Sequence, residues 1–203
     1  MTGDATDVVS GHTGTVVGGI TFSGGQAQVS ATTEYISLPN TIFGSYTSVT
    51  IEMWFSTTSA TITTAERLFQ FGASATGNPG ITIYKYGGLA TGGYGLYYAS
   101  STGATAYLNA NMGGTFASQT NVQIVLTLPA ASYPQVYLNG VLVYTSTVTM
   151  STLPVPSYFY LGQGLEGAPS ADQFYGSIDD VRIWGGVLSA SDILTSFIAG
   201  PSK

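Results

Sequence analysis

Hydrophobic and polar residues alternate along several short stretches of the chain, which is the pattern of half-buried β-strands. The clearest stretch is SVTIEMWFS at residues 48–56, where an apolar side chain takes every second position from Val49 to Phe55. Similar β-type stretches lie at residues 67–71, 80–86, 94–100 and 121–128. Short strands at such regular spacing, separated by turn residues, are typical of a β-sandwich or jelly roll.

The strongest local signal is QVYLNGVLVY at residues 135–144, in which Asn139 and Gly140 separate two apolar runs. A two-residue type I′ turn needs positive φ at both central positions, and the Asn-Gly pair adopts that conformation readily. The stretch therefore predicts a β-hairpin.

Only one stretch, LSASDILTSFIAG at residues 188–200, predicts a helix. Ser189 fits an N-cap with Asp192 three residues later, and Gly200 followed by Pro201 fits the end of a helix. The apolar stripe consists of Ile193, Leu194 and Phe197. One short helix after many strands favours an all-β fold over a βαβ fold, and we expect residues 1–203 to form a single domain.

The composition excludes several classes of partner and chemistry. Charged residues make up 7% of the chain and the formal net charge is −6, with only four lysines and arginines, which argues against nucleic acid. No apolar run approaches the roughly 18 residues of a membrane span, so membrane insertion is not expected. The opening residues show no basic and apolar segments of a signal peptide. Because the chain has no cysteine, disulfides and thiolate ligands are excluded.

Four stretches, in order, resemble the laminin-G-like, concanavalin-A-like jelly-roll domains of extracellular and surface proteins. They are DVVSGHTGTVVGGITF (7–22), TEYISLPN (33–40), SVTIEMWFS, and a closing region of VYLNGVLV, YLGQG and FYGSIDDVRIWGGVLSASDI, which ends at residue 193. The resemblance implies an all-β fold of two curved antiparallel sheets packed as a jelly-roll sandwich, with one short C-terminal helix. It also implies a binding role, often toward glycans or proteins, in some members with calcium at the rim. One departure concerns calcium, because the loop SGGQAQVSAT (23–32) lacks the acidic residue that often lies there.

The stretch QFYGSIDDVRIW (173–184) places Asp179 and Asp180 side by side. Neighbouring side chains on a strand point to opposite faces, so these two carboxylates diverge. Glycoside hydrolysis needs two carboxyl groups that converge on one bond, and this pair does not supply them. Asp180 and Arg182, two residues apart, fit an ion pair on one face.

Asp179 shares its parity with Val181 and Ile183 and is expected to face the core. Two roles remain open for it. A buried carboxylate must be compensated, so Asp179 either accepts hydrogen bonds from the backbone of a neighbouring loop or binds calcium, which takes six to eight oxygen ligands. Asp179 is therefore the candidate metal ligand, and calcium the only cofactor considered.

Two further motifs are interpreted as structural. His12 is the only histidine and lies in a segment rich in glycine and threonine, so we interpret it as an exposed spacer rather than a catalytic base. GQGLEG (162–167) matches G-x-G-x-x-G, but no helix follows it to hold a pyrophosphate, and we interpret it as a loop after a strand.

Tyrosines cluster around the glycine-rich segment 87–95, and two interpretations of them stay open. Tyrosine offers a rigid ring and a hydroxyl to a sugar, and it is equally a good residue for cross-strand packing. The candidate ligand-binding residues are Tyr84, Tyr86, Tyr94 and Tyr97, with Tyr98 and Tyr107 nearby. Trp54 is expected in the core.

Together these observations predict a non-enzymatic binding module on an exterior surface, extracellular, cellular or viral, that recognises carbohydrate. A structural, assembly or attachment module of a virion, fibre or cell surface is the alternative, and a glycan hydrolase or lyase is a third with no motif in its favour. The expected partner is a glycan or a surface protein, and the oligomeric state is left open.

Overall fold

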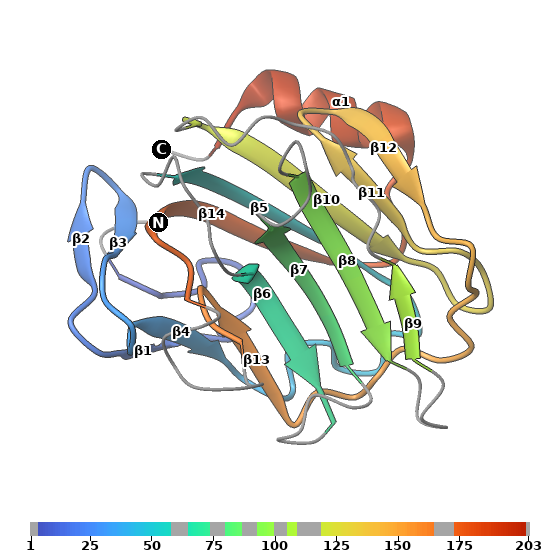
Figure 1. Ribbon diagram of the computed structural model, residues 1–203, viewed down its shortest axis with the longest axis horizontal. Coiled ribbons are helices and arrows are strands. Elements are labelled where there is room, and N and C mark those ends of the chain that lie inside the picture. Colours follow the sequence, from blue (N-terminus) through green and yellow to red (C-terminus); the bar gives the residue numbers. More distant parts are fainter. Residues whose placement is uncertain are drawn as a thin grey trace.

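The computed structural model of the chain describes residues 4–57, 65–73, 80–86, 93–99, 105–108, 119–164 and 173–201. In these ranges the chain forms two antiparallel sheets of seven strands each, stacked face to face, and one helix (Figure 1). The expected all-β jelly-roll sandwich with one short C-terminal helix is confirmed.

The two sheets are named sheet A and sheet B. In spatial order, sheet A contains β1 (Thr15–Val17), β4 (Tyr35–Leu38), β13 (Tyr158–Leu161), β6 (Ala65–Gly72), β7 (Gly80–Tyr86), β8 (Gly93–Ala99) and β9 (Thr105–Leu108). Sheet B contains β12 (Val141–Thr145), β11 (Gln135–Leu138), β10 (Val122–Leu128), β5 (Val49–Thr57), β14 (Gly176–Gly185), β3 (Gln26–Val29) and β2 (Thr21–Ser23).

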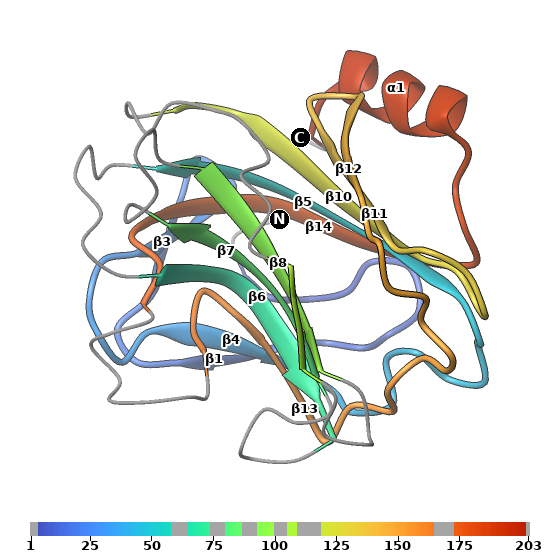
Figure 2. The same cartoon turned by 45° about the vertical axis from the view of Figure 1, so that its right-hand side comes forward.

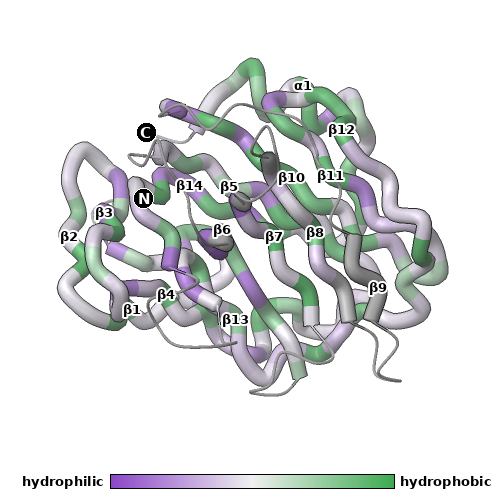
Figure 3. The backbone as a smooth tube through the Cα atoms, in the orientation of Figure 1, coloured by the Kyte–Doolittle hydropathy of each residue, from purple (hydrophilic) through white to green (hydrophobic). Residues whose placement is uncertain are grey.

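The main core lies between the two sheets, where inward and outward side chains alternate along most of each strand. Figure 3 shows the resulting alternation of apolar and polar positions along the strands. Burial of each large apolar side chain stabilises the fold by about 1.5–3 kcal/mol. Five phenylalanines are fully buried there, namely Phe55, Phe69, Phe71, Phe159 and Phe174.

The predicted hairpin is confirmed as β11 and β12. Its two turn residues have the positive φ angles that a type I′ turn requires, 50° at Asn139 and 78° at Gly140. Gln123 on β10 holds this turn, because its backbone pairs with Asn139 and its side-chain oxygen accepts from the N–H of Gly140 at 3.0 Å.

The predicted helix is confirmed as α1 (Ala190–Ala199), which Ser189 caps in a reciprocal capping box with Asp192. The helix lies on the outer face of sheet B, over β10 and β11 (Figure 2). There Ile193 packs against Val125 and Tyr137 in a second, smaller apolar cluster. Among the described residues, no helix has the length and apolar character that crossing a membrane requires.

Candidate functional site

The outer face of sheet A carries a group of tyrosines, because tyrosines and core residues alternate along several of its strands. On β13, Phe159 points into the core while Tyr158 and Tyr160 point outward. The same alternation turns the side chains of Tyr35, Tyr84 and Tyr97 to this outer face. We call these five residues, Tyr35, Tyr84, Tyr97, Tyr158 and Tyr160, the tyrosine face.

The strand register aligns part of this face in one row. Tyr160 lies opposite Gln70, Gln70 opposite Thr82, and Thr82 opposite Tyr97. The row thus crosses four adjacent strands, β13, β6, β7 and β8. Neighbouring strands are about 4.8 Å apart, so its two end tyrosines are separated by three such spacings.

Tyr84 is held in a fixed position on this face. Cζ of Arg67, the residue opposite it on β6, lies 5.0 Å from the centre of the Tyr84 ring, a cation–π arrangement. Across β8, the facing residue is Gly95, and a Cβ there would collide with the Tyr84 ring. The glycine therefore lets the ring lie close against the neighbouring strand.

The other end of the face is a cluster of three rings. The centroids of Tyr35 and Tyr160 are 4.6 Å apart at an interplanar angle of 50°, and those of Tyr158 and Tyr160 are 5.5 Å apart at 45°. Tyr35 and Tyr160 are half-buried, so each keeps part of its ring exposed. Burial and the neighbouring Tyr35 raise the pKa of Tyr160, so its hydroxyl stays protonated at neutral pH and can donate a hydrogen bond.

The segment after β13 passes over the middle of this face. A Cβ at Gly164 would lie 2.7 Å from Cγ of Arg67 and 3.0 Å from Oε1 of Gln70. The Gly164 backbone thus packs directly on these two side chains and restricts their positions. Gly162 to Gly164 form the start of GQGLEG and follow β13 as a loop, as expected, while residues 165–167 lie outside the described ranges.

The four predicted ligand-binding tyrosines do not come together. Tyr84 and Tyr97 both belong to the tyrosine face. Tyr94 points the other way, into the core, where its ring lies 6.0 Å from that of Phe55 and its hydroxyl donates to Oε1 of Gln119 at 2.6 Å. The side chains of Tyr86, Tyr98 and Tyr107 lie outside the described part of the structure.

A buried ion pair lies between the sheets close to Tyr94. Glu66 on β6 faces Lys85 on β7, with Oε2 and Nζ 3.9 Å apart, and their side chains are only 4% and 1% exposed. Burial raises the pKa of Glu66 and lowers the pKa of Lys85, because it disfavours both charged forms, although each charge partly offsets the shift of the other. Sequence analysis missed this pair.

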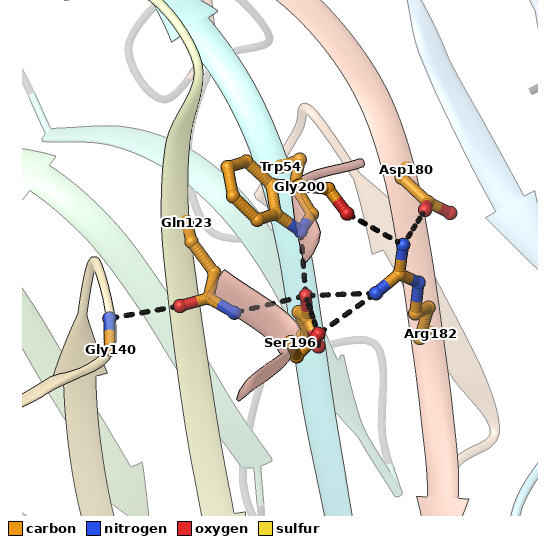
Figure 4. Close-up of polar contacts among 8 residues, drawn as sticks. Trp54, Gln123, Gly140, Asp180, Arg182, Ser196 and Gly200 are labelled. Carbon is orange, nitrogen blue, oxygen red and sulfur yellow. Dashed lines mark hydrogen bonds and ion pairs between the residues drawn. The ribbon is translucent and has the colours of Figure 1, made fainter. Parts of the chain in front are cut away.

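A second polar cluster lies on the outer face of sheet B, beneath α1, and its centre is the fully buried carboxylate of Glu52 (Figure 4). Oε1 of Glu52 accepts from the indole N–H of Trp54 at 2.6 Å and from the side-chain amide of Gln123 at 3.1 Å. The hydroxyl of Ser196 on α1 lies 2.9 Å from both Glu52 oxygens, and Nη1 of Arg182 is 3.4 Å from Oε1.

The same cluster contains the ion pair predicted between Asp180 and Arg182. Nη2 of Arg182 lies 2.7 Å from Oδ2 of Asp180, and the pair is confirmed. Trp54 is buried as expected, but beneath α1 rather than between the sheets, and its indole stacks on Phe197 with ring planes only 6° apart.

The expected orientation of Asp179 is wrong, because the strand does not alternate strictly there. Ile178 pairs with Phe55 and Asp180 with Trp54, so Asp179 is the extra residue of a β-bulge. Its Oδ2 accepts from the side-chain amide of Gln26 at 3.3 Å, and hydrogen bonds from a neighbouring loop backbone to Asp179 stay a prediction. Within the described ranges, no three His, Cys, Asp or Glu residues gather as a metal site, and calcium at Asp179 stays a prediction.

His12 belongs to a turn organised by Asp7. The Asp7 carboxylate accepts from the backbone N–H groups of Val9, Ser10 and His12 and from the Ser10 hydroxyl. The Ser10 hydroxyl bond is the largest cause of a strongly lowered Asp7 pKa. Because Ser10 bonds to the carboxylate directly, His12 does not stand between hydroxyl and acid as the base of a catalytic triad does.

Comparisons with known proteins agree on the architecture. Residues 30–194 match the laminin G-like family model described as the concanavalin A-like lectin/glucanases superfamily. A search of curated proteins gives no match.

Several solved structures share the fold. Domain 4 of AbnA, a GH43 extracellular arabinanase from Geobacillus stearothermophilus solved with arabinotriose, has a TM-score of 0.71 and 20% identity, covering 95% of this chain and 92% of that one. The CBM40 of the Ruminococcus gnavus IT-sialidase, bound to α2,3 sialyllactose, has a TM-score of 0.59 and 19% identity over 76% and 84%. The receptor-binding domain of a botulinum neurotoxin C/D mosaic has a TM-score of 0.68 and 15% identity over 94% of this chain but only 48% of its own length.

Proposed function

The chain belongs to the concanavalin A-like lectin/glucanase superfamily, and from this premise we propose that it is a non-catalytic module that binds carbohydrate through the outer face of sheet A. One observation carries the proposal: the half-exposed rings of Tyr35, Tyr97 and Tyr160 lie on this face, whereas the outer face of sheet B lies partly under α1. Among the similar structures, the arabinanase domain holds arabinotriose and the CBM40 holds sialyllactose. A third, from botulinum neurotoxin type C, concerns a toxin whose cell entry depends on two ganglioside molecules.

The chemistry of the tyrosine face suits a sugar. A sugar ring presents an apolar C–H face that packs on an aromatic ring, and hydroxyls that bond to a phenol. Tyr97 offers a half-exposed ring on β8, and Tyr35 and Tyr160 offer an adjoining pair on β4 and β13, whereas Tyr84 is buried. Because the rings of Tyr35 and Tyr160 already pack against each other before any ligand arrives, binding there costs little side-chain ordering.

The positions of the described carboxylates favour binding over hydrolysis. Glycosidases bring two carboxyl groups to opposite sides of one bond, about 5 to 9.5 Å apart. Glu52 and Asp180 both approach Arg182, which lies between them, and α1 covers Glu52 completely. Glu66 is buried between the two sheets together with Lys85. None of these three carboxylates reaches the tyrosine face.

Two further points follow for the setting of this module. A charge-poor chain without cysteines, rich in hydroxyl groups, suits an exterior surface where disulfides are not needed. Calcium remains part of the proposal only as an ion for which Asp179, at the bulge of β14, is a ligand. Calorimetric titration of the protein with calcium tests this directly. Asp179→Asn serves as the matched variant, and an unchanged calcium isotherm would remove Asp179 as a ligand.

A glycan array probed with the chain, with and without calcium, tests the proposed function. We expect binding to at least one class of glycan, and silence on the whole array would overturn the proposal. For a glycan that binds, Tyr97→Ala and Tyr160→Ala are expected to weaken binding at least tenfold, about 1.4 kcal/mol. Tyr133→Ala is the matched control, because Tyr133 is exposed and lies outside the tyrosine face. Equal losses in all three variants would place the site elsewhere.

A further inference from the structure

The sheets end in four edge strands, β1 and β9 on sheet A and β2 and β12 on sheet B. An edge strand presents unpaired backbone groups, and proteins usually protect it with charged residues, proline, short length or a covering segment. β12 is the longest of the four at five residues, and its sequence VLVYT contains neither charge nor proline. It therefore lacks the protection that a charged residue or a proline would give.

Apolar side chains gather beside this edge. Val141 and Leu142 on β12 are 61% and 46% exposed, and Leu194 and Ile198 on α1 are 45% and 75% exposed. Strand and helix lie side by side here, because a Cβ at Gly140 would come within 2.9 Å of Leu194 (Figure 2). We call the four residues Val141, Leu142, Leu194 and Ile198 the β12–α1 edge.

The fold of the single chain does not explain this exposure. Helix α1 docks mainly through other residues, since Ile193 packs on Val125 and Tyr137 while Phe197 stacks on Trp54, and Leu194 keeps 45% of its surface exposed although it lies against the Gly140 turn. Leu194 and Ile198 are four residues apart and so share one face of the helix. Leu142 lies opposite Tyr137, which places it on the α1 side of sheet B. Leu142, Leu194 and Ile198 thus expose apolar side chains on the same side of sheet B, while Val141, opposite the core-packed Leu138, is exposed on the other face of the strand.

We infer that a second copy of this chain docks on the β12–α1 edge, with the two β12 strands pairing antiparallel about a two-fold axis. The backbone groups of an edge strand are satisfied by another edge strand, and a two-fold arrangement makes the same strand complementary to itself. The chain carries a net charge of −6, but none of that charge lies on β12 or on Leu194 and Ile198. A matching partner surface must likewise be uncharged and apolar, which a second copy provides.

The symmetry of this pairing has a consequence for binding. Antiparallel strands in one continuous sheet are related by a two-fold axis perpendicular to that sheet. The two copies of sheet A then lie on the same side of the joined sheet B, and both tyrosine faces point the same way. If the proposed function holds, two weak sites reach one glycan-bearing surface together and bind with avidity.

The mass of the protein in solution, which requires no glycan, tests the dimer independently of the proposed function. Light scattering after size exclusion, over a series of concentrations, is expected to show a dimer of the 21.0 kDa chain. Leu142→Lys and Ile198→Lys are expected to raise the dissociation constant at least tenfold. Val155→Lys is the control, because Val155 is 78% exposed and lies outside this edge. Thermal unfolding of each variant verifies that the fold is retained.

Two results would overturn the inference. One is a wild-type mass of 21.0 kDa at every concentration. The other is a dimer that both β12–α1 edge variants leave intact, or that the control disrupts equally. The avidity is read separately on immobilised glycan, where Leu142→Lys should dissociate faster than wild type. If the mass data show a dimer but the variant dissociates no faster, the shared orientation of the two tyrosine faces is rejected. If the wild type binds no glycan, only the proposed function is rejected.

Discussion

Arg182 on β14 holds the C-terminal end of α1, because its Nη2 donates to the backbone carbonyl oxygen of Gly200 at 3.2 Å. The last turn of α1 has no basic residue of its own, so a residue from the sheet supplies the cation that favours a helix C-terminus. The same guanidinium reaches the buried Glu52 carboxylate. One side chain therefore links the sheet, the buried acid and the end of the helix.

Removing this guanidinium should destabilise the protein strongly. Arg182→Met leaves the fully buried Glu52 carboxylate without its cation, and breaking a buried ion pair in this way costs about 3–5 kcal/mol. Urea unfolding measures the change in the free energy of unfolding. Arg182→Lys is the control, because it keeps the charge while losing the planar fork, and its loss should be smaller. A loss below about 0.5 kcal/mol for Arg182→Met, typical of a surface substitution, would contradict the role given to Arg182.

The hairpin turn offers a test of the contact between β12 and α1. Gly140 and Gly24 both have positive φ, at 78° and 59°, but a Cβ at Gly140 would press on Leu194 and Phe197, whereas Gly24 has open space around it. Alanine at either position incurs the backbone cost of about 1–2 kcal/mol. Gly140→Ala should lose about 1–3 kcal/mol more, the cost of overpacking. Equal thermal stabilities of the two variants would show that α1 shifts to accommodate the added methyl group without a loss of stability.

The sequence was sufficient to predict the elements whose signals are local. Alternation in residues 48–56 predicted β5, Asn139-Gly140 predicted the β11–β12 turn, and Ser189 with Asp192 predicted the start of α1. Each signal depends on residues adjacent in the chain. Tyr84 and Tyr97 were selected because tyrosines cluster around residues 87–95, and that criterion, which ignores strand parity, also selected Tyr94, which points into the core.

The Glu52 cluster could not be predicted, because it depends on where α1 packs. Alternation along β5 put Glu52 on the polar side of the strand, and that side becomes buried only when a helix from more than 130 residues later covers it, as the Ser196 contact shows. The bulge at Asp179 is equally a product of strand pairing. Lys85 is different, because it shares parity with the core residues Ile81 and Ile83, and this signal was present but overlooked.

The buried pair of Glu66 and Lys85 should show strong energetic coupling. Glu66→Gln leaves a buried ammonium without its carboxylate and Lys85→Met leaves a buried carboxylate, so each should lose about 3–5 kcal/mol of unfolding free energy. The double variant should lose far less than the sum, because replacing a buried pair with uncharged groups is often neutral. A double-mutant cycle by urea unfolding measures the coupling. Losses that simply add would show that the two charges act independently.

The same pair predicts how stability depends on pH. The pKa of Glu66 is raised above 4.5 in the folded protein, so the folded state holds this proton more tightly and the free energy of unfolding falls as pH rises above that value. The pKa of Lys85 is lowered below 10.5, so the folded state holds that proton less tightly and stability recovers as pH approaches 10.5. Urea unfolding of wild type and of the double variant Glu66→Gln/Lys85→Met is measured across this pH range. Subtracting the two free energies of unfolding at each pH removes the contribution of the other titrating groups. The difference in free energy, wild type minus double variant, should pass through a minimum between the two values, and a flat difference would mean that burial does not shift these pKa values.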